Sequence, residues 1–410
     1  MPKILIMHQS GSRGGGSRSL THILKSIDRD RYEIVCYVPP EPADMLEALK
    51  AMGVEAKGRF DLGWVYNHFN GKSYFIFDPR AMANRWYIRR QYENFERILD
   101  EEKPDLLFVN SMTLFWMGEP AKKRGIKTVC FFRETMPYDS LGVRNGIINR
   151  ALKRYFDRVC FISGYDMQRS GFKAPKGVLI YDRVEYDGRI IEKEEACLAL
   201  GLDPNQKYVL YTGGMWGVKG PDVVVSAIRQ VDAKLIFLQY EPQPPEQYKP
   251  EHAGTRNRKI RRLLHMDYEA NVMQYVDRHH LRDKILFMPP VDDIHLVYSA
   301  SDVVCFPSRL PHQAMPIYEA GFYRRPIVLS DFANTREFAK NRYNAYTFMP
   351  GNSFALAGQL NAVLFPDAPG AGKRGEIVIK NFEISVKHHD FDTLRDDIGA
   401  LLDSLDGLGE

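Results

Sequence analysis

The stretch that decides the fold is residues 306–338, which read FPSRLPHQAMPIYEAGFYRRPIVLSDFANTREF. It starts where one short apolar run ends, Val303–Phe306, and it contains a second such run, Pro326–Leu329. A helix starting near Pro316 is expected between the two runs, because proline lacks an amide hydrogen and suits the first turn of a helix. A buried strand, a helix and another buried strand in this order predict a parallel βαβ unit.

The same alternation of apolar runs and helix-like segments continues on both sides of this unit. In the first half of the chain the predicted strands are Lys3–His8, Glu33–Val38, Leu106–Val109, Lys127–Phe132 and Arg158–Ile162. In the second half they are Lys207–Tyr211, Ala233–Leu238, Lys284–Met288, Val303–Phe306 and Pro326–Leu329. Because such runs are typical of parallel sheets covered on both faces, the sequence predicts an α/β fold with two doubly wound sheets.

A chain of 410 residues exceeds what one hydrophobic core usually serves, so two domains are expected. The polar segment Ile180–Glu195 is the predicted hinge. It separates an N-terminal domain, residues 1–185, from a C-terminal domain, residues 186–385, and a helix at about 386–410 is expected to cross back to the first. The segment Glu241–Arg262 is rich in proline and then in basic residues, which predicts a surface excursion.

The composition excludes several classes of protein. A hydrophobic content of 44% and a charged content of 26% are typical of a soluble globular protein. Apolar runs stay well short of the roughly 18 residues of a membrane span. The N-terminal run ILIM is too short for the core of a signal peptide, so a cytoplasmic protein is expected. The five cysteines include no C-x-x-C pair and are expected to be buried, reduced thiols.

Positive charge is concentrated in the first half of the chain. Residues 1–180 carry 29 Lys and Arg against 20 Asp and Glu, whereas the whole chain carries 56 against 52. This suggests an anionic partner, such as a phosphorylated substrate or a lipid surface, but it is too weak a signal to predict nucleic-acid binding. The aromatic stretch Gly71–Pro79 and the basic segment Ala83–Leu99 are compatible with peripheral contact on the inner face of an anionic membrane. A packed amphipathic helix is the alternative interpretation of Ala83–Leu99.

Two glycine-rich turns stand between a predicted strand and a predicted helix. The first is Gly11–Leu20 (GSRGGGSRSL), ahead of a helix expected over Ser19–Ile27. The second lies in Tyr211–Ile228 (YTGGMWGVKGPDVVVSAI), where Lys219 precedes a helix beginning near Pro221. Glycines let backbone amides approach a phosphate closely, and a lysine there could neutralise a diphosphate. Neither turn has the spacing of a P-loop or of G-x-G-x-x-G, so a nicotinamide-dependent dehydrogenase is poorly supported.

Further polar residues follow predicted strands or open predicted helices. The amides of Met315 and Ile317 can bind phosphate oxygens at a helix N-terminus, and Glu319 lies one turn further, within reach of a ribose diol. Arg133 ends a predicted strand, where it could reach a phosphate or an acceptor, and its neighbour Glu134 could orient it or bind acceptor hydroxyls. An intradomain ion pair is the alternative interpretation of Arg133.

Together these motifs resemble the GT-B glycosyltransferases, specifically the large retaining family called family 4, or group 1. The family's G-R-x-x-x-x-K-G turn corresponds to Gly213–Gly220, and its P-S-x-x-E-x-F-G-x-x-x-x-E-A segment to Pro307–Ala320. The closing P-V…E-x-V segment corresponds to Pro326–Phe338, and Asn344–Leu360 resembles the family's G-x-L-x-x-P-G-D-x-x-x-L-A run. The resemblance implies two Rossmann-like domains facing across a deep cleft, the first binding the acceptor and the second the nucleotide-sugar donor.

The resemblance also implies roles for single residues. Lys219 would hold the donor diphosphate, Glu319 the ribose, and backbone groups near Val291 would read the nucleobase. The predicted catalytic residues are Lys219, Arg133 and Glu319. The predicted donor-binding residues are Gly15, Gly16, Gly214, Val291, His312, Gln313, Ala314, Met315, Ile317 and Glu319, with His312–Ala314 lining the sugar. Arg13, Arg18 and Glu134 are the candidates on the acceptor side.

Three departures from the family pattern bear on activity. The arginine of the first motif is Gly214 here, the first glutamate of the second is Pro311, and the strand Ala233–Leu238 runs on into Gln239 where relatives have a glycine-rich turn. Arg13 and Arg18 are candidates for the charge missing at Gly214. The expected function is metal-independent, cofactor-free transfer, with retention, from a UDP-, GDP- or other nucleotide sugar. The acceptor would be a glycan or a lipid-linked acceptor in polysaccharide or glycoconjugate biosynthesis. Two alternatives stay open: a degenerate member that binds without turnover, and a nucleotide-sugar epimerase on the same fold.

Overall fold

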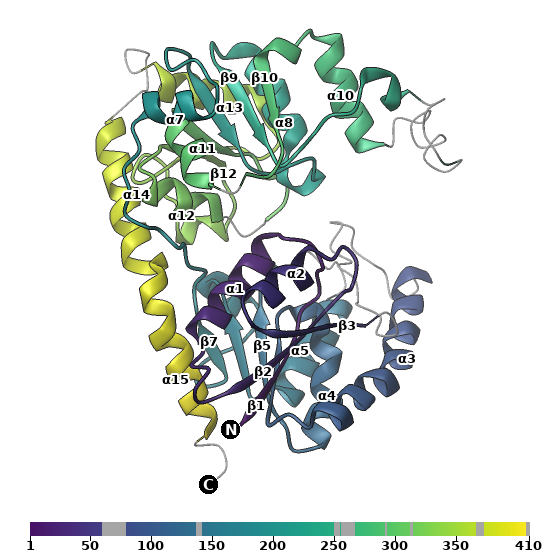
Figure 1. Ribbon diagram of the computed structural model, residues 1–410. Helices are drawn as coiled ribbons and strands as arrows, with labels where there is room; N and C mark the ends of the chain where they lie inside the picture. The colour runs from purple at the N-terminus through teal and green to yellow at the C-terminus, as the bar shows by residue number, and fades with distance from the viewer. Residues whose placement is uncertain are drawn as a thin grey trace. The chain divides into compact units, whose positions relative to one another are not determined.

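A computed structural model describes residues 1–59, 79–136, 142–249, 255, 267–291, 293–311, 315–365 and 373–406, apart from the side chains of residues 79–90, 143, 144 and 406. The chain divides into two units (Figure 1). Unit 1 comprises Met1–Glu185 and His389–Glu410, and unit 2 comprises Tyr186–His388.

Unit 1 is built on a parallel sheet of seven described strands in the order β3-β2-β1-β4-β5-β6-β7. The strands are β1 Lys3–Met7, β2 Glu33–Val38, β3 Glu55–Gly58, β4 Leu106–Val109, β5 Lys127–Phe132, β6 Arg158–Phe161 and β7 Gly177–Leu179. The helices are α1 Gly15–Ser26, α2 Asp44–Ala51, α3 Pro79–Glu102, η1 Met112–Met117, α4 Gly118–Lys123, α5 Val143–Tyr155, α6 Gly164–Arg169, η8 Phe391–Thr393 and α15 Leu394–Asp406.

Side chains of unit 1 alternate between the two faces of this sheet, as the period of a strand requires. In β1, Ile4 and Ile6 belong to a core cluster that also contains residues of α1, α2 and α15. Leu5 and Met7 belong to a second cluster, with residues of α3, η1, α4 and α5. The sheet is therefore covered on both faces, which explains why its central strands are apolar throughout.

The C-terminal helix α15 completes one of these two layers of unit 1. Leu394, Ile398 and Leu405 are buried in the same cluster as α1. Lys127 at the start of β5 donates a hydrogen bond of 2.6 Å to the carbonyl oxygen of Leu405. The first unit is thus assembled from both ends of the chain (Figure 1).

Unit 2 is built on a parallel sheet of six described strands in the order β10-β9-β8-β11-β12-β13. The strands are β8 Tyr208–Tyr211, β9 Lys234–Leu238, β10 Ile285–Met288, β11 Val303–Phe306, β12 Ile327–Ser330 and β13 Tyr346–Phe348. The helices are α7 Lys193–Ala199, η2 Gly217–Lys219, α8 Pro221–Ala227, η3 Ile228–Gln230, η4 Pro245–Tyr248, α10 Tyr268–Arg278, η6 Arg282–Lys284, α11 Ile294–Ala300, α12 Met315–Phe322, η7 Thr335–Glu337, α13 Ser353–Leu364 and α14 Arg374–His389. Helices α8, α10 and α13 share one core cluster with strand residues such as Val209 and Val303.

All ten strands predicted from apolar runs are present, each within one residue at either end. Three strands at or near sheet edges were not predicted: β3 and β7 in unit 1, and β13 in unit 2. They have three or four residues each, too few for a clear pattern. All five cysteines are buried and unpaired, as predicted.

One prediction about local structure was wrong. The first helix begins at Gly15 and not at Ser19, so Gly15–Leu20 of the glycine-rich stretch are helical. Residues 241–249, the described beginning of the segment Glu241–Arg262, are mostly exposed, and Tyr248 anchors them: it is buried and its hydroxyl lies 2.6 Å from that of Tyr240. Residues 250–254 and 256–266 lie outside the described residues.

The segments proposed for membrane contact are described only in part. The stretch 71–78 and the side chains of 79–90 lie outside the described residues. In the second half of α3, Phe95, Ile98 and Leu99 are buried, and the ring of Phe95 packs edge-to-face on Trp116. This half of the helix is a packed amphipathic helix. Among the described helices, none has the length and hydropathy needed to cross a bilayer.

Candidate active site

The strand-exit edge of unit 2 brings the loops after β8 and β11 into contact, because these two strands are neighbours in the sheet. Gly220 has φ +73°, and a Cβ there would lie 2.0 Å from the carbonyl oxygen of Pro307. The amide of Arg309 and the hydroxyl of Ser308 both donate to the carbonyl oxygen of Val218, each at 2.9 Å. Because of this close approach, only glycine fits at position 220. The two hydrogen bonds hold the turn that carries Lys219 against the loop of the P-S motif.

Lys219 ends the short helix η2, directly before Gly220 and α8. Its side chain is half-buried, and its amide donates to the carbonyl oxygen of Trp216 at 2.8 Å. Helix α8 begins with Pro221 and carries Asp222 in its first turn, which suits the positive end of a helix. Lys219 therefore lies where the sequence predicts it, between a strand end and a helix start.

Asp222 is held by two partners from other segments. Arg309 donates to both of its carboxylate oxygens, from Nε at 2.9 Å and from Nη2. The hydroxyl of Tyr268 donates to Oδ1 at 2.5 Å, and burial raises the pKa of this tyrosine. These bonds join α8, α10 and the loop after β11 beneath the Lys219 turn.

Glu319 lies in the second turn of α12 and is almost fully buried, with 3% of its surface exposed. Its Oε2 accepts a hydrogen bond of 2.6 Å from the hydroxyl of Tyr298 on α11. The ring of Tyr298 stacks at 4.8 Å on Tyr323. Tyr298 was not predicted from the sequence, and its place four residues ahead of Asp302 carries no signal that would have singled it out.

Gly214 and Gln239, two of the residues that depart from the family pattern, lie next to one another. Gly214 has φ +59°, and a Cβ built on it would lie 3.1 Å from the carbonyl oxygen of Gln239. Gln239 itself has φ +66°. The carbonyl oxygen of Gly214 accepts a hydrogen bond of 3.0 Å from Tyr211. The local backbone therefore favours glycine over the family's arginine at position 214, because any side chain would be strained at this positive φ.

The other predicted donor residues are placed around the same sheet edge. Val291 follows β10 and is half-buried, and Met315 opens α12. Ile317, in the first turn of α12, has 1% of its surface exposed. Pro311, at the position of the family's first glutamate, is exposed. His312, Gln313 and Ala314 lie outside the described residues.

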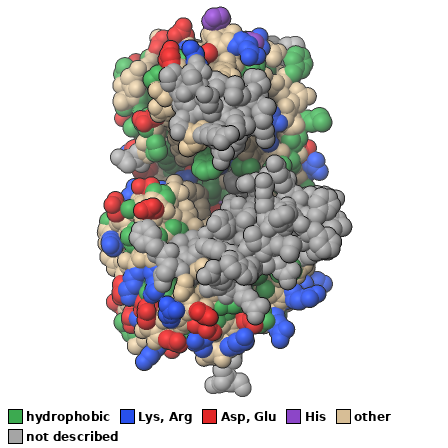
Figure 2. Space-filling view, turned by 90° about the vertical axis from the view of Figure 1, so that its right-hand side faces the viewer, with side chains coloured by type: hydrophobic (Ala, Val, Ile, Leu, Met, Phe, Trp, Pro, Cys, Tyr) green, Lys and Arg blue, Asp and Glu red, His purple; other side chains and the backbone are tan. Residues whose placement is uncertain are grey.

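At the strand-exit edge of unit 1, the glycine-rich stretch opens α1. Gly15 and Gly16 lie in its first turn, where an added Cβ would meet no heavy atom within 4 Å. The N-cap residue Gly14 provides no side chain to bind the first amides, and no acidic residue stands in the first turn. Arg13 and Arg18 are exposed on either side. On the face shown in Figure 2, basic and acidic side chains are intermixed rather than gathered by sign.

Arg133 is engaged within unit 1, and its ion pair corresponds to the alternative interpretation given above. Its Nη1 lies 2.7 Å from Oδ1 of Asp182, and its Nε donates to Oδ1 of Asn110 at 3.0 Å. Only 7% of its side chain is exposed. Its guanidinium group also lies over the ring of Phe131, 5.1 Å from the centroid.

Glu134 does not pair with the Arg133 guanidinium. One of its oxygens accepts a hydrogen bond from the hydroxyl of Ser111, and the other accepts from the amides of Met112 and Arg133, both at 3.1 Å. Burial raises the pKa of Glu134, although these hydrogen bonds act in the opposite direction. This carboxyl group orients the start of η1 and the end of β5.

Sequence reasoning missed three further polar residues at this edge: His8, Asn110 and Asp182. His8 follows β1 directly and Asn110 follows β4 directly. His8 is fully buried and Asn110 has 1% of its surface exposed. A polar residue immediately after an apolar strand was the signal that could have found both, because that is where open α/β sheets place their functional groups.

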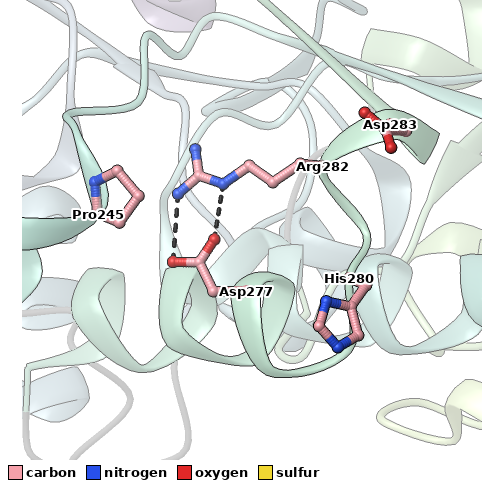
Figure 3. Close-up of a pocket in the computed structure, with 5 residues that line it drawn as sticks. All are labelled: Pro245, Asp277, His280, Arg282 and Asp283. Carbon is pink, nitrogen blue, oxygen red and sulfur yellow. Dashed lines mark hydrogen bonds and ion pairs between the residues drawn. The ribbon is translucent and has the colours of Figure 1, made fainter.

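The described part of the chain also contains a surface pocket of about 490 Å³. Pro245, Asp277, His280, Arg282 and Asp283 line it. Figure 3 shows Arg282 facing Asp277, with its Nε and Nη2 at 2.6 and 3.2 Å from the two carboxylate oxygens. None of these five residues is a predicted site residue: Arg282 and Asp283 precede β10, and Pro245 lies in η4, after β9. Among the described residues, no group of three or more His, Cys, Asp or Glu is arranged to hold a metal ion.

Comparison with known proteins assigns the chain to a family. Residues 13–169 match the model described as "Glycosyltransferase Family 4", and residues 192–367 match the one described as "Glycosyl transferases group 1". The structure of Anabaena HepE in complex with UDP-glucose is similar, with a TM-score of 0.74 and 17% identity, over 98% of this chain and 100% of that one. Sucrose-phosphate synthase from Thermosynechococcus elongatus is similar over the whole of both chains, with a TM-score of 0.74 and 16% identity.

A curated relative matches over a shorter stretch. The D-inositol 3-phosphate glycosyltransferase of Xylanimonas cellulosilytica is 26% identical over 172 residues, which are 41% of this chain and 36% of that protein. The match therefore spans about a third of the relative's length. The two family models, by contrast, cover most of unit 1 and most of unit 2 in turn. The chain belongs to glycosyltransferase family 4, the group 1 glycosyl transferases, a family of retaining, metal-independent GT-B enzymes that use nucleotide sugars.

Proposed function

We propose that this protein transfers a sugar, with retention, from a nucleotide sugar to a glycan or lipid-linked acceptor in polysaccharide or glycoconjugate biosynthesis. The observation that carries the proposal is the strand-exit edge of unit 2. There the Lys219 turn is bonded to the loop of the P-S motif, and Glu319 lies on the helix that follows this loop. The resemblance to the family implies that these positions hold the donor.

The chemistry requires positive groups that are fixed before the reaction starts. Breaking the bond between sugar and diphosphate builds negative charge on the leaving diphosphate, and preorganised donors stabilise that charge. Lys219 supplies a cation, and the amides at the start of α12 supply a helix N-terminus. Glu319 accepts hydrogen bonds from the ribose hydroxyls, and the departing phosphate itself takes the proton of the acceptor.

A uridine diphosphate sugar is the first donor to test. The support is that Anabaena HepE, which shares the fold, was solved in complex with UDP and with UDP-glucose. On the acceptor side, the support is the exposed Arg13 and Arg18 beside the glycine-rich turn of unit 1. Two exposed cations suit an acceptor that carries phosphate, such as a lipid-linked one.

The experiment is a thermal-shift screen of the full chain with UDP-, GDP-, ADP- and dTDP-sugars. A ligand that binds only the folded protein at about 100 times its Kd stabilises it by about 2.7 kcal/mol, which raises the midpoint measurably. We expect one nucleotide class to raise the midpoint and the others not to. Failure of all four classes to bind, with binding measured independently by calorimetry, contradicts the proposal.

A second candidate function is binding of the nucleotide sugar without turnover. Gly214 and Pro311 favour it, since each replaces a charged residue of the family motif. The positive φ of Gly214 would also strain an arginine at that position. Binding in the screen, followed by neither hydrolysis nor transfer across a panel of glycan and lipid-linked acceptors, would favour this candidate over the first.

A further inference from the structure

A ring of hydrogen bonds, which the backbone between Ser17 and Ser19 closes, lies beside the glycine-rich turn of unit 1. His8, Asn110 and Arg133 follow β1, β4 and β5, which are neighbours in the sheet. Their side chains are almost fully buried, with 0% of His8 and 1% of Asn110 exposed. The bonds from Asn110 to His8, from Arg133 to Asn110 and Asp182, and from Ser19 to Asp182 join segments that are far apart in the sequence.

The proton positions in this ring follow from Arg133. A guanidinium group only donates, so its Nε, 3.0 Å from Asn110, identifies Oδ1 of that amide as the acceptor. The amide nitrogen of Asn110 then points the other way. It donates to the carbonyl oxygen of Gly16 at 3.1 Å and to Nδ1 of His8 at 3.0 Å.

Since Nδ1 of His8 accepts a hydrogen bond, the proton of the neutral ring resides on Nε2. Burial, together with the charge of Arg133, lowers the pKa of His8 to about 3, which keeps its imidazole neutral at pH 7. Nε2 lies 3.0 Å from the hydroxyl of Ser17 and donates to it. The Ser17 hydroxyl in turn donates to the carbonyl oxygen of Ser12 at 2.7 Å.

The ring closes through Asp182. Oδ1 of Asp182 pairs with Arg133 at 2.7 Å and also accepts a hydrogen bond from the hydroxyl of Ser19. Ser17 and Ser19 stand at the beginning of α1, so the ring starts and ends beside the same glycines. The carbonyl oxygen of Asp182 is itself held by Nδ1 of His389 at 2.7 Å.

We infer that His8 is a positioning residue, which transmits the orientation imposed by Arg133 and Asn110 to Ser17 and so holds the first amides of α1 ready to bind phosphate oxygens of a substrate. The ligand in this statement rests on the proposed function, whereas the positioning rests on the ring. Gly14, Gly15 and Gly16 have no side chains to restrict their backbone, and glycine loses more conformational freedom on ordering than any other residue. The buried ring below them offsets that loss.

The proton position on His8 gives a direct spectroscopic test. We expect ¹⁵N spectra of the full chain at pH 7 to show His8 protonated at Nε2, with the signal assigned by its loss in His8→Gln. Asn110→Asp replaces the donor to Nδ1 by an acceptor, so the proton is expected to move to Nδ1 or to occupy both nitrogens. An Nδ1 proton in the wild type, or an unchanged tautomer in Asn110→Asp, overturns the inference.

Hydrogen exchange tests the positioning of the turn without any ligand. Ser17→Ala removes the hydrogen bonds from His8 and to Ser12, and it should raise amide exchange over residues 9–19 about tenfold or more. Ser26→Ala is the matched control, because this buried serine lies in the last turn of the same helix and bonds only locally, to the carbonyl oxygen of His22. Equal exchange over residues 9–19 in Ser17→Ala, Ser26→Ala and the wild type contradicts the inference.

Affinity for UDP separates this inference from the proposed function. If the turn meets the diphosphate, Ser17→Ala should weaken UDP binding about tenfold and Ser26→Ala should not. Raised exchange with unchanged UDP affinity would overturn the ligand part of the inference. If wild-type protein does not bind UDP, the proposed donor is wrong, and the tautomer and exchange results still decide whether His8 positions the turn.

Discussion

The hydroxyl of Tyr298 donates a hydrogen bond of 2.6 Å to Oε2 of Glu319, between two neighbouring helices of unit 2. The carboxylate is 3% exposed, so its direction is set by this contact and by the packing around it. The ribose-binding role proposed for Glu319 requires accurately pointed oxygens, and the hydroxyl of Tyr298, whose ring packs on Tyr323, would provide that orientation.

Tyr298→Phe should therefore weaken donor binding about tenfold while leaving turnover at saturating donor nearly unchanged. The change removes one oxygen and keeps the ring, so the carboxylate loses a hydrogen bond of about 1–3 kcal/mol. The measurement is the ratio of Kd values for the ribonucleoside diphosphate and its 2′-deoxy and 3′-deoxy analogues. We expect this ratio to approach one in the variant.

Tyr208→Phe is the control for that prediction. Tyr208 is equally buried, and its hydroxyl accepts from the amide of Asp203, ahead of β8 rather than after it. Both variants should lose stability, but only Tyr298→Phe should lose discrimination between ribose and deoxyribose. Unchanged discrimination in Tyr298→Phe would show that Glu319 does not act through this contact.

Lys219→Ala should lower turnover about 10²-fold or more, the scale for removing one preorganised electrostatic contact to a leaving group. Transfer and donor hydrolysis are the assays, each followed by release of the nucleoside diphosphate. Lys340→Ala, at an exposed lysine of the same unit, is the matched control and should keep full activity. Equal turnover in the two variants would remove Lys219 from the catalytic set.

Gly214→Arg restores the family's arginine in sequence but should destabilise unit 2 rather than raise activity. A side chain at φ +59° costs about 1–2 kcal/mol, and its Cβ would lie 3.1 Å from the carbonyl oxygen of Gln239. Urea unfolding, followed by hydrogen exchange in peptides of unit 2, measures the loss. Gly358→Ala, within α13 where a Cβ meets nothing within 4 Å, should be neutral or stabilising. A gain in turnover without loss of stability in Gly214→Arg would contradict this account.

Glu102 should make unit 1 sensitive to acid. Burial alone would raise the pKa of this carboxyl, but hydrogen bonds from Lys57, Tyr37 and Lys3 lower it to about 2. Because the folded pKa lies below the unfolded one, Glu102 stabilises the fold fully above about pH 4.5, and this contribution is lost as the pH falls toward 2. A shift of this size corresponds to about 3 kcal/mol.

The test is the stability of Glu102→Gln relative to the wild type across that range. We expect a large difference at pH 7 that shrinks between pH 4.5 and 2, measured by urea unfolding followed by exchange in β1 and β4. Glu101→Gln, at the exposed neighbour that pairs with Arg59, should differ little from the wild type at any pH. A difference for Glu102→Gln that is constant with pH would show that charge is not its cause.

What the sequence determined by itself was the local pattern. The apolar runs identified ten strands to within a residue, because parallel strands buried on both faces must be apolar along their length. Glycine and proline identified the turn at Gly220 and the start of α8, since their backbone preferences act within a few residues. The placement of Lys219 between a strand and a helix follows from the same local rules.

The tertiary structure alone decided which polar groups meet. Arg133 and Asp182 are 49 residues apart, and their pairing depends on β5 and the chain after β7 ending at one sheet edge. Tyr298 reaches Glu319, and Gly214 meets Gln239, through the packing of separate segments. Hydrogen bonds depend on distances and angles between atoms of different elements, and no periodic pattern in the sequence encodes those. The order of residues thus determined ten of the strands, and packing determined which groups Glu319, Arg133 and His8 contact.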